Sequence, residues 1–178
     1  MTTLLMKLCA MEDEHFQMAQ PEGWVGVASL LANGADPNEQ DENGNTAMHM
    51  VFSKGTPCLG IMDMLLQAGS VLDVPNKYGL TPLMVGLHWV EASDLMSFPK
   101  LVDAIFWLSR NNANWLMEDH QGVSALDITR KWINLHDNTH WQTEGRRQIK
   151  ECAEAVVSKA NLVQEIPQTH TRSIQRKI

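Results

Sequence analysis

The sequence predicts an all-α protein built from repeated units, and the first observation behind this is a recurring block. Each copy has Asp or Asn, a glycine three residues later and Thr or Ser two residues after that. A small residue or proline and then an apolar residue follow. The block occurs at residues 41–49, 76–84 and 119–127. Internal repetition of this kind is the sequence signature of repeat architectures.

A second block and its fixed distance from the first are the other two observations. It begins with a leucine pair, passes through glycine and ends near Asn or Asp; it occurs at residues 30–38, 65–73 and, in degraded form, 108–116. The step from the second block to the next Thr or Ser is always 12 residues. The three steps are Gly34 to Thr46, Gly69 to Thr81 and Asn112 to Ser124. Three equal steps indicate one structural unit used repeatedly.

The residue types predict where helices begin and end. Thr46 and its equivalents suit the N-cap of a helix, and Pro82 suits the first helical position. Gly34, after the leucine pair, allows the left-handed conformation that ends a helix. The pair Asn43 and Gly44 favours a tight turn between units. Each unit is therefore expected to contain an inner helix, an outer helix and a turn.

These blocks resemble the ankyrin repeat, whose motif contains Thr-Pro-Leu-His and later Leu-Leu-x-x-Gly-Ala-x-x-Asn. The matching residues include Thr81-Pro82-Leu83, Thr46 with His49, and Gly34-Ala35 with Asn38, and the resemblance covers roughly residues 3–130. It implies a helical solenoid with short hairpin-like turns, which binds protein partners through the turn tips and inner helices. No cofactor and no enzymatic activity are predicted, because the residues contain no signature of either.

The repeat spacing departs from the family period of about 33 residues. The Thr or Ser anchors fall at residues 3, 46, 81 and 124. Because the 12-residue step from the second block to the next anchor never changes, the extra length must lie between inner and outer helices. Insertions are expected at residues 10–23, 89–100 and 135–144, as longer helices or as loops. The predicted repeat domain spans residues 1–160, with repeats at about 1–40, 41–75, 76–118 and 119–160. Residues 161–178 are expected to form a flexible tail.

Charge and composition limit the partners. The net charge of −7 disfavours nucleic-acid binding, which requires a basic surface. No stretch is apolar enough to span a membrane and no secretory signal is evident, although a non-classical export signal would escape this test. Three widely spaced cysteines suit a reducing cytoplasm, including a host cytoplasm if the chain is an exported effector.

Candidate chemistry is sparse. Cys9, Cys58 and Cys152 lack any nucleophile or metal signature, and no phosphate-binding loop occurs. His136 and His140 would share a helix face, but no third metal ligand is evident. No metal site is predicted. The alternative function is a metal-binding protein or small enzyme built on the His- and Trp-rich insertions around His88, His136 and His140.

The favoured function is a protein-binding module that blocks or tethers its partner, in the manner of an effector or an inhibitor. The acidic first turn suggests a basic patch on that partner. Turn tips and side insertions remain alternative binding surfaces, and the oligomeric state is open. The residues predicted to contact the partner are Glu39, Glu42, Tyr78, Trp89, Trp115, His120 and Trp141.

Overall fold

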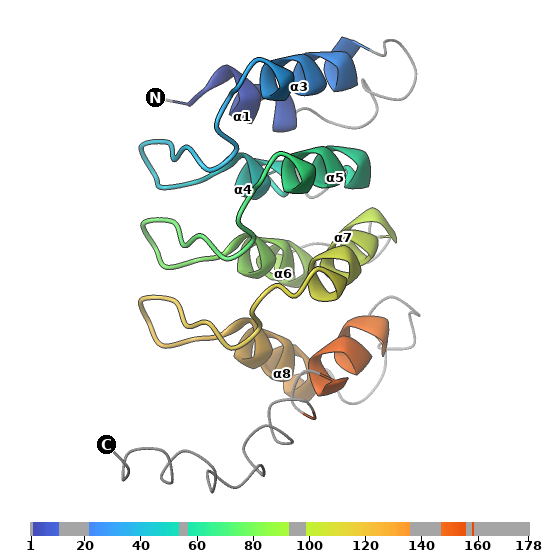
Figure 1. The fold of residues 1–178 in the computed structure, drawn as a ribbon. Helices are drawn as coiled ribbons and strands as arrows, with labels where there is room; N and C mark the ends of the chain where they lie inside the picture. Colours follow the sequence, from blue (N-terminus) through green and yellow to red (C-terminus); the bar gives the residue numbers. More distant parts are fainter. Residues whose placement is uncertain are drawn as a thin grey trace, which may run out of the picture.

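The computed structural model is a stack of helix pairs (Figure 1). It describes residues 2–10, 22–53, 57–92, 99–135, 147–155 and 158. The inner helices are α1 (Leu4–Cys9), α4 (Ala47–Val51), α6 (Pro82–Ala92) and α8 (Ala125–Leu135). The outer helices are α3 (Glu22–Ala32), α5 (Leu59–Gln67) and α7 (Pro99–Arg110). Residues 147–155 are also helical. The all-α solenoid predicted from the sequence is confirmed.

The helices of the first three pairs pack within their pair and against the next pair. α1 contacts α3, α4 contacts α5, and α6 contacts α7. Between pairs, α1 contacts α4, α4 contacts α6 and α6 contacts α8 along the inner layer. The outer layer has the same order, with α3 on α5 and α5 on α7. Stability in such a stack is a sum of unit and nearest-neighbour terms.

The predicted anchors begin all four inner helices. Thr3 is the N-cap of α1, where its hydroxyl accepts a 3.2 Å hydrogen bond from the backbone N–H of Met6. The other anchors, Thr46, Thr81 and Ser124, stand directly before α4, α6 and α8. This placement satisfies N–H groups that the first helical turn leaves unpaired.

The outer helices end in one common way. Gly34, Gly69 and Asn112 follow α3, α5 and α7 with φ angles of 86°, 91° and 64°. Each donates its N–H to a carbonyl three residues back, at 3.0 to 3.2 Å. This left-handed stop turns the chain toward the next unit. Asn112 is the one non-glycine residue with positive φ in the described part of the chain, and Asn tolerates that conformation better than most side chains.

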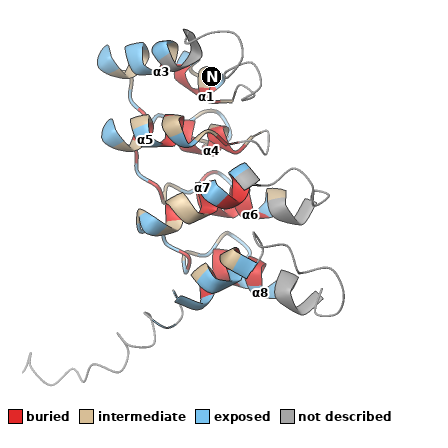
Figure 2. Ribbon diagram, turned by 90° about the vertical axis from the view of Figure 1, so that its right-hand side faces the viewer, coloured by how far each residue is buried: buried red, intermediate tan, exposed pale blue. Residues whose placement is uncertain are grey.

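One continuous apolar core runs between the two helix layers, and Figure 2 shows the buried residues gathered there. Its largest fully buried side chains include Phe52, Met48, Leu87 and Trp115. Several methionines that the repeat places on inner helices, such as Met48 and Met84, are fully buried. They fill the core rather than forming an adaptable surface.

The extra length lies between inner and outer helices, as predicted. Part of it extends the inner helices, because α6 and α8 each have 11 residues whereas α4 has 5. The remainder falls at residues 11–21, 93–98 and 136–146, which lie outside the described residues. The tail at 161–178 also lies outside them.

Candidate functional site

Three hairpin-like tips project from the inner side of the stack (Figure 1). We name them tip 1 (residues 39–45), tip 2 (74–80) and tip 3 (117–123). In tip 1 the carboxylate Oδ1 of Asp41 accepts hydrogen bonds from the backbone N–H of Asn43 and of Asn45, both at 2.8 Å. Asn76 and Asp119 accept the same pair of bonds in tips 2 and 3. The recurring Asp or Asn therefore sets the shape of every tip.

Hydrogen bonds join tip 1 firmly to tip 2. The N–H of Lys77 donates to the carbonyl of Asn43 at 2.9 Å, and the Gln40 amide donates to the carbonyl of Pro75 at 3.1 Å. The Asn76 amide also donates to Asn45 Oδ1 at 3.0 Å. Between tips 2 and 3, the N–H of His120 donates to the carbonyl of Tyr78 at 3.2 Å. The tips thus form one ordered edge of the molecule.

A hollow of about 370 Å³ opens between tip 2, tip 3 and the inner helices α6 and α8. Its lining residues are Tyr78, Leu80, His88, Asp119, Gln121, Val123, Asp127, Ile128 and Lys131. Tyr78 is 64% exposed, so most of its ring is accessible to a partner. The hollow presents both apolar and charged groups beside one exposed aromatic ring. Together with the three tips it makes up what we call the tip face.

Charge is unevenly spread over the tips. Tip 1 carries three acids, Glu39, Asp41 and Glu42, and no base. Tip 2 carries one base, Lys77, and tip 3 carries the acids Glu118 and Asp119. The tip face is therefore acidic at tip 1, basic at its centre and acidic again at tip 3.

The carboxylate of Asp127, within the hollow, is already engaged by its own helix. It accepts hydrogen bonds from the hydroxyl and from the backbone N–H of Ser124. These bonds hold the pKa of Asp127 below its usual range, and Arg130, 3.7 Å away, acts in the same direction. Asp127 thus caps α8 and stays charged at the rim of the hollow.

The structure places most of the predicted contact residues at the surface. Glu39, Glu42 and His120 are exposed, and Tyr78 lines the hollow. Trp89, on α6, is half-buried and packs against the core.

Trp115 requires a correction, because its side chain is only 1% exposed and so belongs to the core. Its indole N–H donates to the hydroxyl of Ser109 at 2.9 Å, which satisfies the ring's polar atom in the interior. Trp141 lies outside the described residues, as do His136 and His140.

Sequence reasoning missed the contribution of α8 to the hollow. Asp127, Ile128 and Lys131 line it, and their i, i+1, i+4 spacing on a predicted helix is the signal that could have found them. In the described part of the chain, no three His, Cys, Asp or Glu side chains come together in a way that could hold a metal ion. None of the helices described there combines the length and apolar character that crossing a membrane requires.

Comparison with known proteins gives a consistent result. A family model described as ankyrin repeats in many copies matches residues 7–57. An ankyrin repeat protein of Rickettsia felis is 33% identical over 57 residues, which make up 30% of this chain and 25% of the relative. The inhibitor of apoptosis OPG037 of vaccinia virus is 30% identical over 71 residues, 40% of this chain and 15% of the relative.

A third relative is protein fem-1 homolog A of Bos taurus. It is 38% identical over 55 residues, 31% of this chain and 8% of the relative. The chain therefore matches a quarter or less of the length of each of these three proteins.

Proposed function

The chain belongs to the ankyrin-repeat family, whose repeats are typically non-enzymatic protein-binding modules, and we propose that its tip face holds a protein partner and so blocks or tethers it. The observation that carries this proposal is the hollow beside Tyr78, which joins two tips to two inner helices. Exposed aromatic residues at the centre of such surfaces commonly supply much of the binding free energy.

The proposed contact is a loop or extended segment of the partner. A hollow of about 370 Å³ can take one or two side chains, while the neighbouring tips offer polar groups at its rim. Tyr78 would pack against an apolar part of that segment, and Glu39, Glu42 and His120 would contact its flanks. Trp89, half-buried on α6, would add apolar surface to the contact.

The proposed partner carries a basic patch opposite tip 1. Three carboxylates close together raise the local negative potential and speed the approach of a positively charged surface. Exposed charge pairs are screened by salt, so the association rate should fall as ionic strength rises. Lys77 at the centre would meet an acidic or polar group on the same partner.

We also propose that the chain blocks its partner and that it acts in the cytoplasm. One relative is named an inhibitor of apoptosis, which supports an inhibitor-like role, although the match covers 15% of that protein. Cys9, Cys58 and Cys152 are free thiols, and Cys9 is buried. Unpaired cysteines of this kind suit a reducing compartment such as the cytoplasm.

The test is quantitative affinity capture from an extract of the source cells, with captured proteins measured by mass spectrometry. The doubly reversed variant Glu39→Lys, Glu42→Lys should lose at least about tenfold of one specific partner, and the wild-type capture should weaken with salt. The variant Glu151→Lys, Glu154→Lys, with both changes at exposed positions of the helix at residues 147–155, alters the net charge by the same amount and should retain that partner. Equal capture by wild type and tip variant would contradict the basic-patch proposal.

A further inference from the structure

The outer helix α7 carries large aromatic residues at positions where the other outer helices do not. The outer helices can be aligned on Gly34, Gly69 and Asn112, the left-handed residues that follow them. In this alignment Phe106 of α7 is equivalent to Ala28 of α3 and Asp63 of α5. Trp107 stands where these two helices have Ser29 and Met64. Two other copies of the repeat therefore pack without aromatic side chains at these positions, so packing of the repeat does not require aromatic residues there.

The two aromatic rings lie beside an open hollow on the outer side of the stack. It has a volume of about 340 Å³, and its lining residues are Leu59, Asp103, Phe106, Trp107, Arg110, Asn111 and Gln148. Phe106 and Trp107 are half-buried, and Leu59 is 37% exposed at the start of α5. This surface is distinct from the tip face, because it is formed by outer helices.

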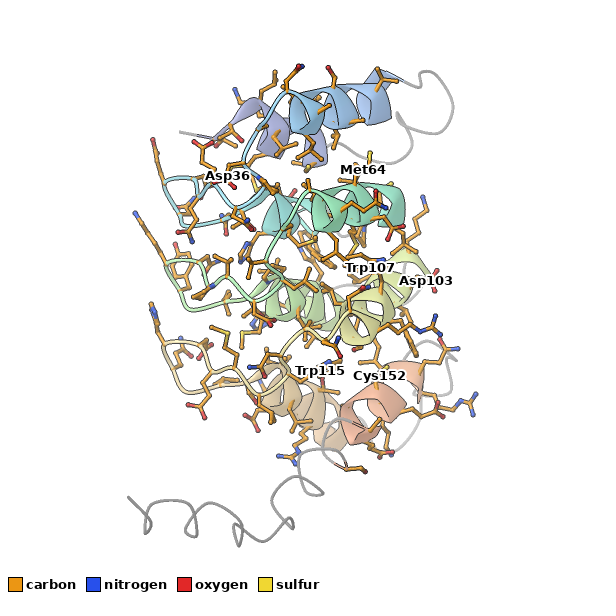
Figure 3. The ribbon with its side chains drawn as sticks, in the orientation of Figure 1. Asp36, Met64, Asp103, Trp107, Trp115 and Cys152 are labelled. Atoms are coloured by element: carbon orange, nitrogen blue, oxygen red, sulfur yellow. The ribbon has the colours of Figure 1, made fainter. Side chains whose placement is uncertain are left out.

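Both rings are held in place by specific contacts. The indole N–H of Trp107 donates to the carboxylate of Asp63 on α5 at 2.7 Å. The guanidinium carbon of Arg110 lies 6.0 Å from the centre of the Phe106 ring, a cation–π distance. Figure 3 shows Trp107 and Asp103 on the α7 side of the stack, with Met64 on the neighbouring pair. The rings are thus presented in a fixed arrangement before any partner arrives.

One acid and one base flank the rings along α7. Asp103 and Arg110 are both exposed and are seven residues apart, which places them on one helix face about 10 Å apart along the axis. Neither of them forms an ion pair with another residue in the described part of the chain. We call these four residues, Asp103, Phe106, Trp107 and Arg110, the α7 wall.

The α7 wall is complementary to itself. Its acid and base lie at equal distances on either side of the midpoint between Phe106 and Trp107. A second α7 running antiparallel across a two-fold axis at that midpoint brings Asp103 of each copy opposite Arg110 of the other. It also brings the aromatic pairs together at the centre. Two-fold contacts of this kind are the commonest form of homo-oligomeric interface.

From this symmetry we infer that the occupant of the α7 wall is a second copy of the chain, and that the protein forms an antiparallel two-fold dimer through α7. The central rings lose contact with water, and two Asp103–Arg110 pairs close the ends of the interface. One helix and its flanks give a small interface, so the dimer forms reversibly with protein concentration. Dimerisation leaves the tip faces of both copies open.

The test measures mass by sedimentation velocity or light scattering from about 1 μM to about 1 mM, which spans the affinities of small interfaces. The wild-type chain should move from the mass of one 20.0 kDa chain to that of two as concentration rises. Asp103→Arg and Arg110→Asp each place like charges opposite one another in the dimer. Each variant alone should therefore stay at the mass of one chain across the range.

Mixing the two variants tests directly whether position 103 of one copy faces position 110 of the other. In a mixed pair, the arginine introduced at position 103 of one variant faces the aspartate introduced at position 110 of the other. At the opposite end, the native Arg110 of the first variant faces the native Asp103 of the second, so an equimolar mixture should recover the mass of two chains. Glu39→Arg is the matched control on the tip face and should dimerise like wild type. Circular dichroism checks that each variant is folded, which is expected because both changed side chains are exposed.

Three results would overturn the dimer. They are a wild-type chain that keeps the mass of one chain at all concentrations, charge variants that dimerise as well as wild type, and a mixture that stays at the mass of one chain. A wild-type chain that never dimerises would mean that a different protein, and not a second copy, occupies the α7 wall. Partner binding at the tip face is measured separately by affinity capture, so a chain that does not dimerise could still bind its partner.

Discussion

The side chain of His49 links two neighbouring repeats, because its Nε2 lies 3.0 Å from the carbonyl oxygen of Leu80 in the next unit. Its Nδ1 accepts the backbone N–H of Thr46 at 3.1 Å, so the proton of the neutral ring sits on Nε2 and donates to Leu80. His49 is only 2% exposed. One imidazole thus caps α4 and fastens tip 2 to it.

The first prediction concerns the pH dependence of stability. Burial lowers the pKa of His49 below its ordinary value of about 6.5. As pH falls below about 6.5, the unfolded chain takes up a proton that the folded chain does not, so the free energy of unfolding decreases. The loss continues until the lower folded-state pKa is reached, at up to about 1.4 kcal/mol per pH unit. Urea unfolding between pH 8 and pH 5 measures it.

The variant His49→Met is the matched control, because methionine occupies the equivalent position at Met84. It should be about 1–3 kcal/mol less stable than wild type at pH 8, since it leaves buried polar groups of Thr46 and Leu80 without partners. The difference should shrink toward pH 5. Parallel stability curves for the two proteins would show that His49 does not titrate as described.

The second prediction compares two tip glycines. A Cβ at Gly79 would stand 2.6 Å from the backbone nitrogen of His120, whereas one at Gly122 meets no atom within 4 Å. Both have positive φ, at 81° and 75°, so alanine strains both. Gly122→Ala should cost about 1 kcal/mol, and Gly79→Ala should cost about 2–4 kcal/mol because tip 3 must also move. Equal costs by chemical denaturation would argue against the close stacking of tips 2 and 3.

The third prediction concerns a brace between outer loops. Asp73 accepts the backbone N–H of Asn114 at 2.8 Å, and Asn38 accepts that of Val71 at 2.7 Å one unit earlier. Asp73→Ala should lower the free energy of unfolding by about 1–2 kcal/mol, because it leaves one N–H unpaired. Asp73→Asn should cost less than about 0.5 kcal/mol, since asparagine already does this work at position 38. Thermal or urea unfolding distinguishes the two, and similar losses for both would contradict the brace.

The fourth prediction concerns thiol reactivity. Burial between helices raises the pKa of Cys9 to about 12, with Cys58 nearby acting in the same direction. The thiolate is the reactive form, so Cys9 should be alkylated far more slowly than the half-buried Cys58 in the folded protein at pH 8. Peptide mass spectrometry after timed iodoacetamide treatment gives both rates. Denaturation in urea should bring them close together, and equal rates in the native protein would place Cys9 at the surface.

The sequence predicted the repeat frame well because that frame depends on local residue chemistry. The Thr or Ser before each inner helix and the Gly or Asn after each outer helix act within a few residues of their own position. The 12-residue step from Gly34 to Thr46 therefore translated directly into one loop and one tip. Extra residues between helices were also placed correctly, because the step itself never changes.

The surface was harder to predict, because burial depends on neighbours distant in sequence. Trp115 was expected at the partner surface, yet it holds the position that Leu72 holds one unit earlier, and both side chains are buried. Aligning the copies residue by residue would have given this result. The spacing of Asp127, Ile128 and Lys131 predicts only that they share one face of α8, whereas the distance of that face from tip 2 depends on packing between units.

Binding of a protein partner at the tip face can be tested by photo-crosslinking from position 78. A photoreactive amino acid replaces Tyr78 in one protein and Ala28, an exposed residue of the outer helix α3, in the other. Both are irradiated in an extract of the source cells, and the adducts are identified by mass spectrometry. We expect a specific partner adduct from position 78 that is lost in the Glu39→Lys, Glu42→Lys background and is absent from position 28. The same partner crosslinked from position 28 and not from position 78 would contradict it.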